Sequence, residues 1–425
     1  MHSQWCTLFI HGEGTSSAIN IYPLGVGFYF SVLVVTGFTR TSIGKNPNCN
    51  MIPTPFLCTL NLTVSIIKKI SCYKESTWDT YNNGLMDTFN ISNRRYLGNK
   101  YKLSAWIKEV VEENCGEINS FFDVFSGTGS VASAFVDKRL VVCDMMYCNY
   151  LAALCWFSPQ SFDKDKLVRL MEYYNTYDVS NESNYMSENF ADTYFDLYNS
   201  QKIGFVRDDI ERRFHCKEVN EKERAMVITS LIYAMDRISH TCGHYDSFIR
   251  DGKYVGELLL RMPNNDYLLN SKNSIYCADS NSIASKEFVD LAYLDPPYNS
   301  RQYCDAYHLL ENVARWEKPH VYGIAKKMDR SEMKSSYCKS IEAAKSLKDL
   351  VLNLNARFIM LSYNNNGKKL QCRSNAKISD GEIMEILSLR GDVKVFTMDY
   401  HGFDAGKSEY NKDNKERLFL CSVNK

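Results

Sequence analysis

The tetrapeptide Asp295-Pro296-Pro297-Tyr298 has the residue types needed to transfer a methyl group to an exocyclic amine. The amine of adenine is a poor nucleophile, because its lone pair is conjugated with the ring. Asp295 can accept one N–H hydrogen bond, and the carbonyl of Pro296 can accept the other without competition from an N–H of its own. Two such acceptors favour a tetrahedral nitrogen whose lone pair faces the methyl group. Tyr298 offers a flat ring on which an extruded base can stack.

The tetrapeptide follows a predicted buried strand at 288–294. Consecutive prolines cannot continue a central strand, so they hold the chain rigid at the carboxyl end of the sheet, where α/β enzymes bind ligands. A strand that ends in a proline turn is common, so the tetrapeptide alone is a weak indication. Its weight depends on what stands at the ends of the other predicted strands.

One of these ends is a glycine turn. A predicted buried strand at 118–125 runs directly into Ser126-Gly127-Thr128-Gly129-Ser130, and an apolar helical start follows at 131–135. A strand, a glycine turn and a helix in this order present backbone N–H groups and a helix N-terminus to a ligand. Glycine also lets the ligand approach closely, because it has no Cβ. A tight turn that binds nothing remains the alternative.

Acidic residues stand at two further strand ends. Asp144 ends a strand predicted at 140–143, at about the distance from the glycine turn where doubly wound folds place a ribose-binding acid. A dinucleotide would suit this pattern too, but Ala132 replaces the third glycine of that fingerprint. Asp279, after a strand predicted at 274–277, could accept from an adenine amino group. An ordinary turn or helix-capping role for Asp279 stays open.

The composition is that of a globular protein. The 425 residues are 45% hydrophobic and 24% charged, and the formal net charge is zero. A zero charge neither excludes nor indicates a nucleic-acid partner, because a local basic face can exist on a neutral protein. The 15 cysteines form no CxxC pair, which predicts reduced thiols and a cytoplasmic protein. His240, Cys242 and His244, with Cys216 upstream, fit no standard zinc spacing, so we interpret them as a polar loop and expect no metal.

Several separated segments resemble the Dam-like class of adenine-specific DNA methyltransferases, and within it the FokI-associated branch. They are RRYLGNKYKL at 94–103, FFDVFSGTGSVASAF at 121–135 and YLDPPYNSRQYCDAYHLLENVARW at 293–316. Weaker matches stand at 236–249, 358–367 and 415–423, so the resemblance covers 94–425.

The resemblance implies a doubly wound, Rossmann-like α/β domain with a helical insertion. Such an enzyme takes its methyl group from S-adenosylmethionine and transfers it to the N6 amine of an adenine flipped out of DNA. It belongs to a restriction-modification setting, where a cognate restriction endonuclease can be a partner. Methylation of adenine in structured RNA and a non-catalytic DNA-binding protein are the alternatives. A pure binder does not need the two acceptors, which argues against the second. We expect a monomer without membrane association.

The resemblance also assigns roles to residues. It places Tyr96 and Lys100 against the cofactor, with Lys100 near the cofactor carboxylate. It places Phe125, Gly127 and Gly129 around the methionine part.

At the other end of the cofactor, Asp144 would hold the ribose and Asp279 the adenine, and 295–298 would hold the target base. This class also carries basic residues near its carboxyl terminus. Here those residues are interleaved with acids, which puts a strong DNA contact there in doubt: Lys407, Lys412, Lys415 and Arg417.

The insertion is predicted at 160–270, between catalytic segments at 86–159 and 271–425. It is too long for a loop and has helical patterns of its own. Its basic residues have acidic neighbours, so they could form a solvated helix face: Arg207, Arg212, Arg213, Lys217, Lys222 and Arg224. They could also contact phosphates in a target-recognition region, and the position in the fold favours this interpretation.

Residues 1–85 differ from the rest. The run 19–38 has no charge and approaches the length of a membrane span, but it contains Asn20 and Pro23. An accessory segment, a membrane anchor and upstream sequence read through a misassigned start codon are the three interpretations. We favour the last, because the family pattern is complete from Met86, shortly before the basic segment. We also expect the terminal strands 392–398 and 416–423 to pair antiparallel at the sheet edge.

Overall fold

The computed structural model describes residues 6–12, 15–21, 87–250, 254, 256–265, 267–298, 300–364, 378–399 and 415–424. The chain divides into two compact units, Met1–Asn83 and Gly84–Lys425. In the first unit, β1 (Cys6–Gly12) and β2 (Thr15–Ile21) pair antiparallel. Most of 1–85 lies outside the described residues, as do Met86, Lys407 and Lys412, so the interpretations of that segment stay predictions. No helix among the described residues is long and apolar enough to cross a membrane.

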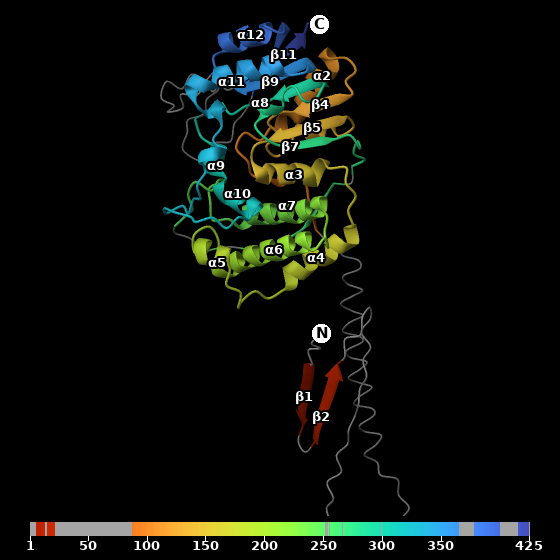
Figure 1. Ribbon diagram of the computed structural model, residues 1–425, viewed down its shortest axis with the longest axis vertical. Coiled ribbons are helices and arrows are strands. Elements are labelled where there is room, and N and C mark those ends of the chain that lie inside the picture. Colours follow the sequence, from red (N-terminus) through yellow and green to blue (C-terminus); the bar gives the residue numbers. More distant parts are fainter. Residues whose placement is uncertain are drawn as a thin grey trace, which may run out of the picture. The chain divides into compact units, whose positions relative to one another are not determined.

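The second unit is built on a seven-stranded sheet with the order β10-β11-β9-β8-β4-β5-β7 (Figure 1). Its strands are β4 (Ser120–Asp123), β5 (Arg139–Asp144), β7 (Ser274–Cys277), β8 (Val289–Leu294), β9 (Ala356–Asn364), β10 (Gly391–Asp399) and β11 (Lys415–Val423). All neighbours pair parallel except β11, which runs antiparallel to both β9 and β10. The prediction of a Rossmann-like α/β fold is confirmed, and β9 is the strand that the sequence analysis did not assign.

Each central strand is apolar on both faces, as parallel strands covered by helices are. Along β4, Phe121 packs into one core and Phe122 into the other. Helices α2 (Ser104–Asn114) and α3 (Tyr147–Phe157) contribute side chains to the first core. Helices α8 (Ser280–Ile283), α11 (Ser340–Asn353) and α12 (Asp380–Ser388) contribute to the second. The strand ends are thereby fixed, and with them the residues that follow the strands.

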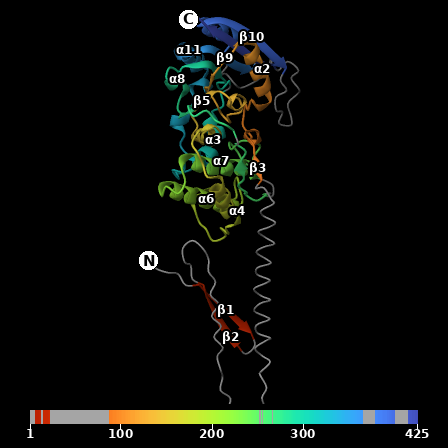
Figure 2. The ribbon, with the colours of Figure 1, turned by 90° about the vertical axis from the view of Figure 1, so that its right-hand side faces the viewer.

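The insertion folds as four helices: α4 (Lys164–Thr176), α5 (Tyr185–Phe190), α6 (Leu197–His215) and α7 (Glu221–Ile238). Two views place α4 and α6 at the end of this unit that is farthest from α11 and β10 (Figures 1 and 2). The apolar core runs without a break from α7 through α3 into the sheet. The strand β6 (Met262–Pro263) pairs with β3 (Thr88–Phe89), so the chain before the sheet is tied to the end of the insertion.

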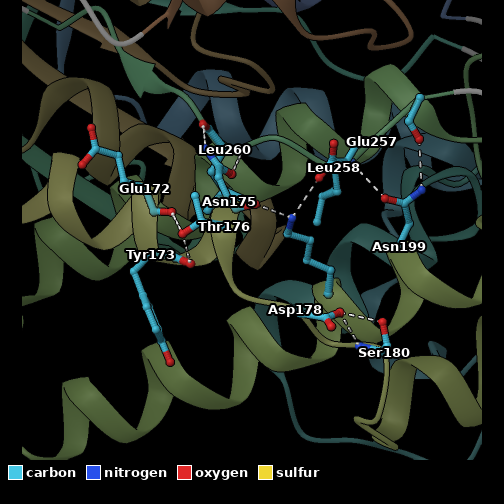
Figure 3. A network of polar contacts seen from close by, with 12 residues as sticks. Glu172, Tyr173, Asn175, Thr176, Asp178, Ser180, Asn199, Glu257, Leu258 and Leu260 are labelled. Atoms are coloured by element: carbon cyan, nitrogen blue, oxygen red, sulfur yellow. Dashed lines mark hydrogen bonds and ion pairs between the residues drawn. The ribbon is translucent and has the colours of Figure 1, made fainter. Parts of the chain in front are cut away.

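A buried lysine organises the inside of the insertion. Lys202 of α6 is fully buried, and its Nζ donates to the Asn175 carbonyl at 2.8 Å and lies 3.3 Å from Glu257 Oε1. Asn175 also exchanges hydrogen bonds with the backbone of Leu260 at 2.8 and 2.9 Å. Figure 3 shows Asn175, Glu257 and Leu260 in one network of polar contacts. This network joins the end of α4, the first half of α6 and the extended segment 256–260.

Most of the basic residues singled out in the insertion are buried or ion-paired, whereas Lys217 is exposed. Arg207 is fully buried, and its Nε donates to the carbonyl of Val313 at 2.6 Å, at the end of α10 (His308–Arg315). Lys222 is buried and donates to the Ser158 carbonyl at 2.6 Å. The remaining pairs join Arg212 and Arg213 to Asp209 and Glu218, and Arg224 to Glu211. The expectation that these residues contact phosphates is therefore wrong for Arg207 and Lys222. The assignment of the whole insertion to target recognition stays a prediction.

Replacing Arg207 by alanine should lower the free energy of unfolding by about 3 kcal/mol, because it leaves buried acceptors without their donor and empties a packed site. Urea unfolding followed by circular dichroism measures this. Arg212→Ala is the control, since that guanidinium is half exposed and on the same helix, and it should change the stability little. Equal stabilities of the two variants would show that Arg207 is not an internal anchor.

Candidate active site

An open cavity lies at the carboxyl ends of β4, β5, β7 and β8. Its empty volume, including the part open to solvent, is about 900 Å³. It brings together most of the residues that the sequence predicts for the site: Tyr96, Lys100, Phe125, Gly127, Asp144, Asp279, Asp295 and Pro297. Gly129, Pro296 and Tyr298 do not line it.

The glycine turn follows β4 as predicted, but its two glycines have different tasks. Gly127 and Gly129 both have positive φ angles, 53° and 79°, which favour glycine. A Cβ on Gly129 would lie 2.7 Å from the ring of Phe157, so this glycine makes room for core packing. The apolar helical start expected at 131–135 is a single 3-10 turn, Ala132–Phe135, which makes a helix-dipole contribution at this turn small.

Asp144 closes the glycine turn from the neighbouring strand. Its Oδ2 accepts from the N–H of Gly127 and its Oδ1 from the N–H of Met146, both at 2.8 Å. Each oxygen keeps a second lone pair for a ligand. Burial raises the pKa of Asp144 to about 6, so the carboxylate is mainly ionised at neutral pH.

Asp279 caps the short helix α8. Its Oδ1 accepts from the N–H of Asn281 at 2.9 Å, and the residue also lines the cavity. The sequence leaves two interpretations of Asp279 open, a helix cap and a ligand acceptor. This one side chain can be both.

A buried ion pair stands at the end of β8. Lys100 Nζ lies 2.8 and 2.7 Å from the two carboxylate oxygens of Asp295 and is 5% exposed. Burial raises the pKa of Asp295 to about 6, although Lys100 lowers it, and the nearby Glu416 raises it as well. Lys100, expected beside a cofactor carboxylate, is bonded here to the acid of the tetrapeptide.

The sequence analysis passed over Asp123, the last residue of β4. It lines the cavity, and its Oδ2 accepts from the N–H of Ala132 at 3.2 Å. Burial raises its pKa to about 8, so this carboxyl is mainly neutral at pH 7. An acid at the last position of an apolar strand, two residues before Phe125, was the signal available. Beside it, the buried Ser126 Oγ lines the cavity and has no hydrogen-bond partner among the described residues.

A tyrosine stack also escaped the sequence analysis. The ring of Tyr96 stacks on Tyr307 at 4.6 Å and on Tyr303 at 5.4 Å between centroids. Asn149 Nδ2 donates to the Tyr96 hydroxyl at 2.9 Å, and Arg94 Nη1 donates to Asn149 Oδ1 at 2.9 Å. The i, i+4 spacing of two tyrosines just after the tetrapeptide was the available signal. Arg94, in the basic segment, is thus an internal residue that holds one wall of the cavity.

Helix α10, which follows the tetrapeptide, supports the start of helix α3. Glu311 of α10 is fully buried, and its two carboxylate oxygens accept from the N–H groups of Tyr147 and Cys148 at 2.9 Å. These are the first residues of α3, three and four positions after Asp144. A carboxylate at a helix N-terminus satisfies N–H groups that have no partner within the helix.

The histidines at 240 and 244, which the sequence analysis interpreted as part of a polar loop, contact other residues. Among the described residues, no three His, Cys, Asp or Glu side chains are placed to hold a metal ion. The Nε2 of His244 lies 3.2 Å from Arg301 Nη2, and the ring of His240 lies beside Tyr254.

Comparison with known proteins gives a consistent result. The D12 class N6 adenine-specific DNA methyltransferase family matches residues 96–369. The modification methylase StsI of Streptococcus sanguinis is 33% identical over 76% of this chain and 51% of its own length. The type II methyltransferase M.FokI of Planomicrobium okeanokoites is 31% identical over 76% and 52%. The chain thus spans about half the length of these two relatives. The type II methyltransferase M.NlaIII of Neisseria lactamica is 28% identical over 75% of this chain and 95% of its own length.

Removing one partner of the buried ion pair should be strongly destabilising. Lys100→Met should lower the free energy of unfolding by about 3–5 kcal/mol, because it leaves the Asp295 carboxylate buried without a counter-charge. The double variant Lys100→Met/Asp295→Asn should recover part of this loss. Urea unfolding of the wild type, Lys100→Met, Asp295→Asn and the double variant measures the coupling energy of the pair. Lys339→Met, in an exposed pair with Glu342, is the control and should have little effect. If the stability losses of the two single variants simply add in the double variant, Lys100 and Asp295 do not stabilise each other.

Proposed function

The chain belongs to the D12 class of N6 adenine-specific DNA methyltransferases, and we propose from this that it methylates the N6 amine of an adenine extruded from DNA. The observation that carries the proposal is the position of Asp295. It stands at the end of β8 and lines a cavity that the glycine turn also lines. A donor molecule in that cavity would have its methyl group close to an amine held by Asp295.

We assign S-adenosylmethionine as the methyl donor. The cavity offers what such a ligand needs: acids at the ends of two neighbouring strands, a glycine turn, an aromatic side chain at Phe125 and an unpartnered hydroxyl at Ser126. In this assignment Asp144 accepts from the ribose hydroxyls and Asp279 from the adenine amino group. Tyr96, Phe125 and Gly127 surround the rest of the S-adenosylmethionine molecule. The cofactor supplies a methyl group that is already activated on a sulfonium, so the protein's main task is alignment.

The tetrapeptide would hold the target base. Asp295 and the Pro296 carbonyl accept the two N–H bonds of the amine, and Tyr298 stacks on the base. Lys100 can keep one oxygen of Asp295 while the other oxygen accepts from the amine. With a pKa of about 6, Asp295 is ionised above that pH and is the nearest base for the proton that the amine loses. Below that pH the protonated carboxyl is no longer a full acceptor, and methyl transfer should slow.

The names of the relatives support a restriction-modification setting, in which a cognate endonuclease would be a partner. We assign recognition of the DNA sequence to the inserted region 160–270, together with the loops at the cavity mouth. Sequencing of unmethylated DNA after treatment with the purified protein and S-adenosylmethionine tests the function. N6-methyladenine in one sequence context is the expected result. Transfer to RNA with none to DNA would overturn the proposal.

Asp295→Asn should reduce methyl transfer to DNA by more than about a hundredfold, because Lys100 would hold the amide oxygen and leave the NH2 donor facing the target amine. Transfer of a tritiated methyl group measures the rate, and calorimetric titration with S-adenosylhomocysteine should show an affinity close to that of the wild type. Asp290→Asn is the matched control, because Asp290 lies near the other end of β8, and it should retain activity. An Asp295→Asn rate within about tenfold of wild type would remove Asp295 from the reaction.

Asp144→Ala should weaken the binding of S-adenosylhomocysteine by a factor between roughly 10 and 150, since a hydrogen bond to a charged group contributes about 1.5–3 kcal/mol. Calorimetric titration measures the dissociation constant. An unchanged constant in a folded Asp144→Ala protein would exclude the ribose assignment.

A further inference from the structure

A turn at 322–327 presents two apolar side chains to solvent. Ile324 is 69% exposed and Tyr322 is 51% exposed. A single exposed apolar residue is ordinary, but here both stand on one narrow turn that ends in Lys326 and Lys327. The hydroxyl of Tyr322 donates to the Met328 carbonyl at 3.3 Å, so the Tyr322 side chain is fixed on the turn. Ile324 stands at the tip of the turn.

The turn has a defined backbone. The N–H of Tyr322 donates to the Lys327 carbonyl at 2.9 Å, and the N–H of Lys327 donates back to Tyr322 at 3.0 Å. The N–H of Lys326 donates to the Gly323 carbonyl at 3.2 Å. Gly323 and Lys326 have φ angles of 71° and 50°, which lets the chain reverse within four residues. Ile324 therefore projects from a formed turn and not from a featureless loop.

The turn is anchored to the rest of the protein directly after Ile324 and again at its end. The Tyr194 hydroxyl donates to the Ala325 carbonyl at 2.9 Å, and Lys327 Nζ lies 2.8 Å from Asp246 Oδ1. The other oxygen of Asp246 accepts from Arg301 Nη2 at 2.6 Å. Arg301 follows the last residue of the tetrapeptide by three positions. One carboxylate thus ties the turn to the chain that leaves the active site.

The turn also belongs to a segment whose two ends form the rim of the cavity. Gln302 and Ser335 both line the cavity, and they exchange hydrogen bonds at 2.8 and 3.1 Å. Between them the chain forms α9 (Tyr303–Ala306), α10 and the turn. Figure 1 shows α9 and α10 between the sheet and the helices α5 to α7. The turn is therefore carried by the same segment that closes one side of the candidate active site.

The charge around the turn suits a polyanion. Between 317 and 339 the chain has six lysines and arginines against three acids. Four of the six form ion pairs: Lys318, Lys327, Arg330 and Lys339. Lys326 and Lys334 have no ion-pair partner among the described residues. Duplex DNA attracts such a local excess through its phosphates. Most basic residues of α6 and α7 are paired or buried, whereas Lys326 and Lys334 belong to the segment whose ends line the cavity.

We propose that the turn 322–327 enters the DNA duplex and that Ile324 fills the space left by the extruded adenine. This inference rests on the proposed function. Extruding a base costs a few kcal/mol of lost stacking and pairing. Apolar side chains inserted between base steps are a known way for proteins to stabilise distorted DNA. An isoleucine on a narrow, anchored turn, next to lysines and tied to the residues after Tyr298, has the chemistry and position for this role.

The test compares Ile324→Ala with wild type on two duplexes that contain the recognised site. In one, the target adenine is paired; in the other, an abasic site stands opposite the target, so that extrusion costs less. Single-turnover methylation of the paired duplex should fall on the order of tenfold or more, because unstacking is no longer compensated. The abasic duplex should be methylated within about threefold of the wild-type rate. With 2-aminopurine in place of the target, the variant should show a weaker fluorescence rise on the paired duplex.

Leu389→Ala is the matched control. Leu389 is 52% exposed and stands just before β10, at the edge of the sheet opposite the cavity. This variant should behave as wild type on both duplexes, and thermal unfolding of Ile324→Ala should also match wild type. Wild-type rates of Ile324→Ala on the paired duplex would overturn the inference, and so would an equal loss on both duplexes. A wild-type protein that methylates neither duplex would overturn the proposed function, and this inference with it.

Discussion

The buried pair of Lys100 and Asp295 is the interaction on which the rest of the site depends. An ionised carboxylate inside a protein needs a counter-charge, and here the only one within hydrogen-bonding distance among the described residues comes from the segment before β4. That segment must therefore cross the carboxyl ends of the strands. It is fastened there by Ser104 Oγ, which donates to the Ser130 carbonyl, and by Ser130 Oγ, which donates to Asn99 Oδ1. The acid of the tetrapeptide and the glycine turn are thus joined through one short stretch of chain.

The helical insertion is connected to this arrangement through α10. Arg207 of α6 donates to a carbonyl at the end of α10, and Glu311 of the same helix caps α3 directly after Asp144. Two buried charged residues therefore link α6, α10 and the wall of the cavity. Because the apolar core is continuous across the same elements, a change in the insertion has a direct physical route to the cofactor cavity. An enzyme that must recognise a site before it acts can use such a route.

The strands and their polar ends could be predicted because both depend on local patterns. Apolar runs followed by Asp144, Asp279 and Asp295 indicate both the strands and the acids that line the cavity at the strand ends. Asp123 escaped because its signal, an acid at the last position of an apolar strand, does not by itself show that the side chain is buried beside a cavity. The partner of Lys100 escaped because the two residues are 195 positions apart, and only the folded sheet brings them together. The roles of Arg207 and Lys222 were misjudged for the opposite reason: a basic residue in a helical pattern is the same in sequence whether it meets a phosphate or a buried carbonyl.

The zero net charge acquires a physical meaning once the ion pairs are known. In the insertion, many arginines and lysines are balanced by acids or carbonyls at short distance, and these produce little field at the surface. Others, such as Arg169 and Lys217, are exposed. A protein that holds its charges this way binds DNA through a few local features instead of a broad basic face. The stretch 317–339 is such a feature, because Lys326 and Lys334 have no ion-pair partner among the described residues and because Met333, Ser335 and Tyr337 within it line the cavity. Under the proposed function, this stretch would attract phosphates beside the cavity that receives the adenine.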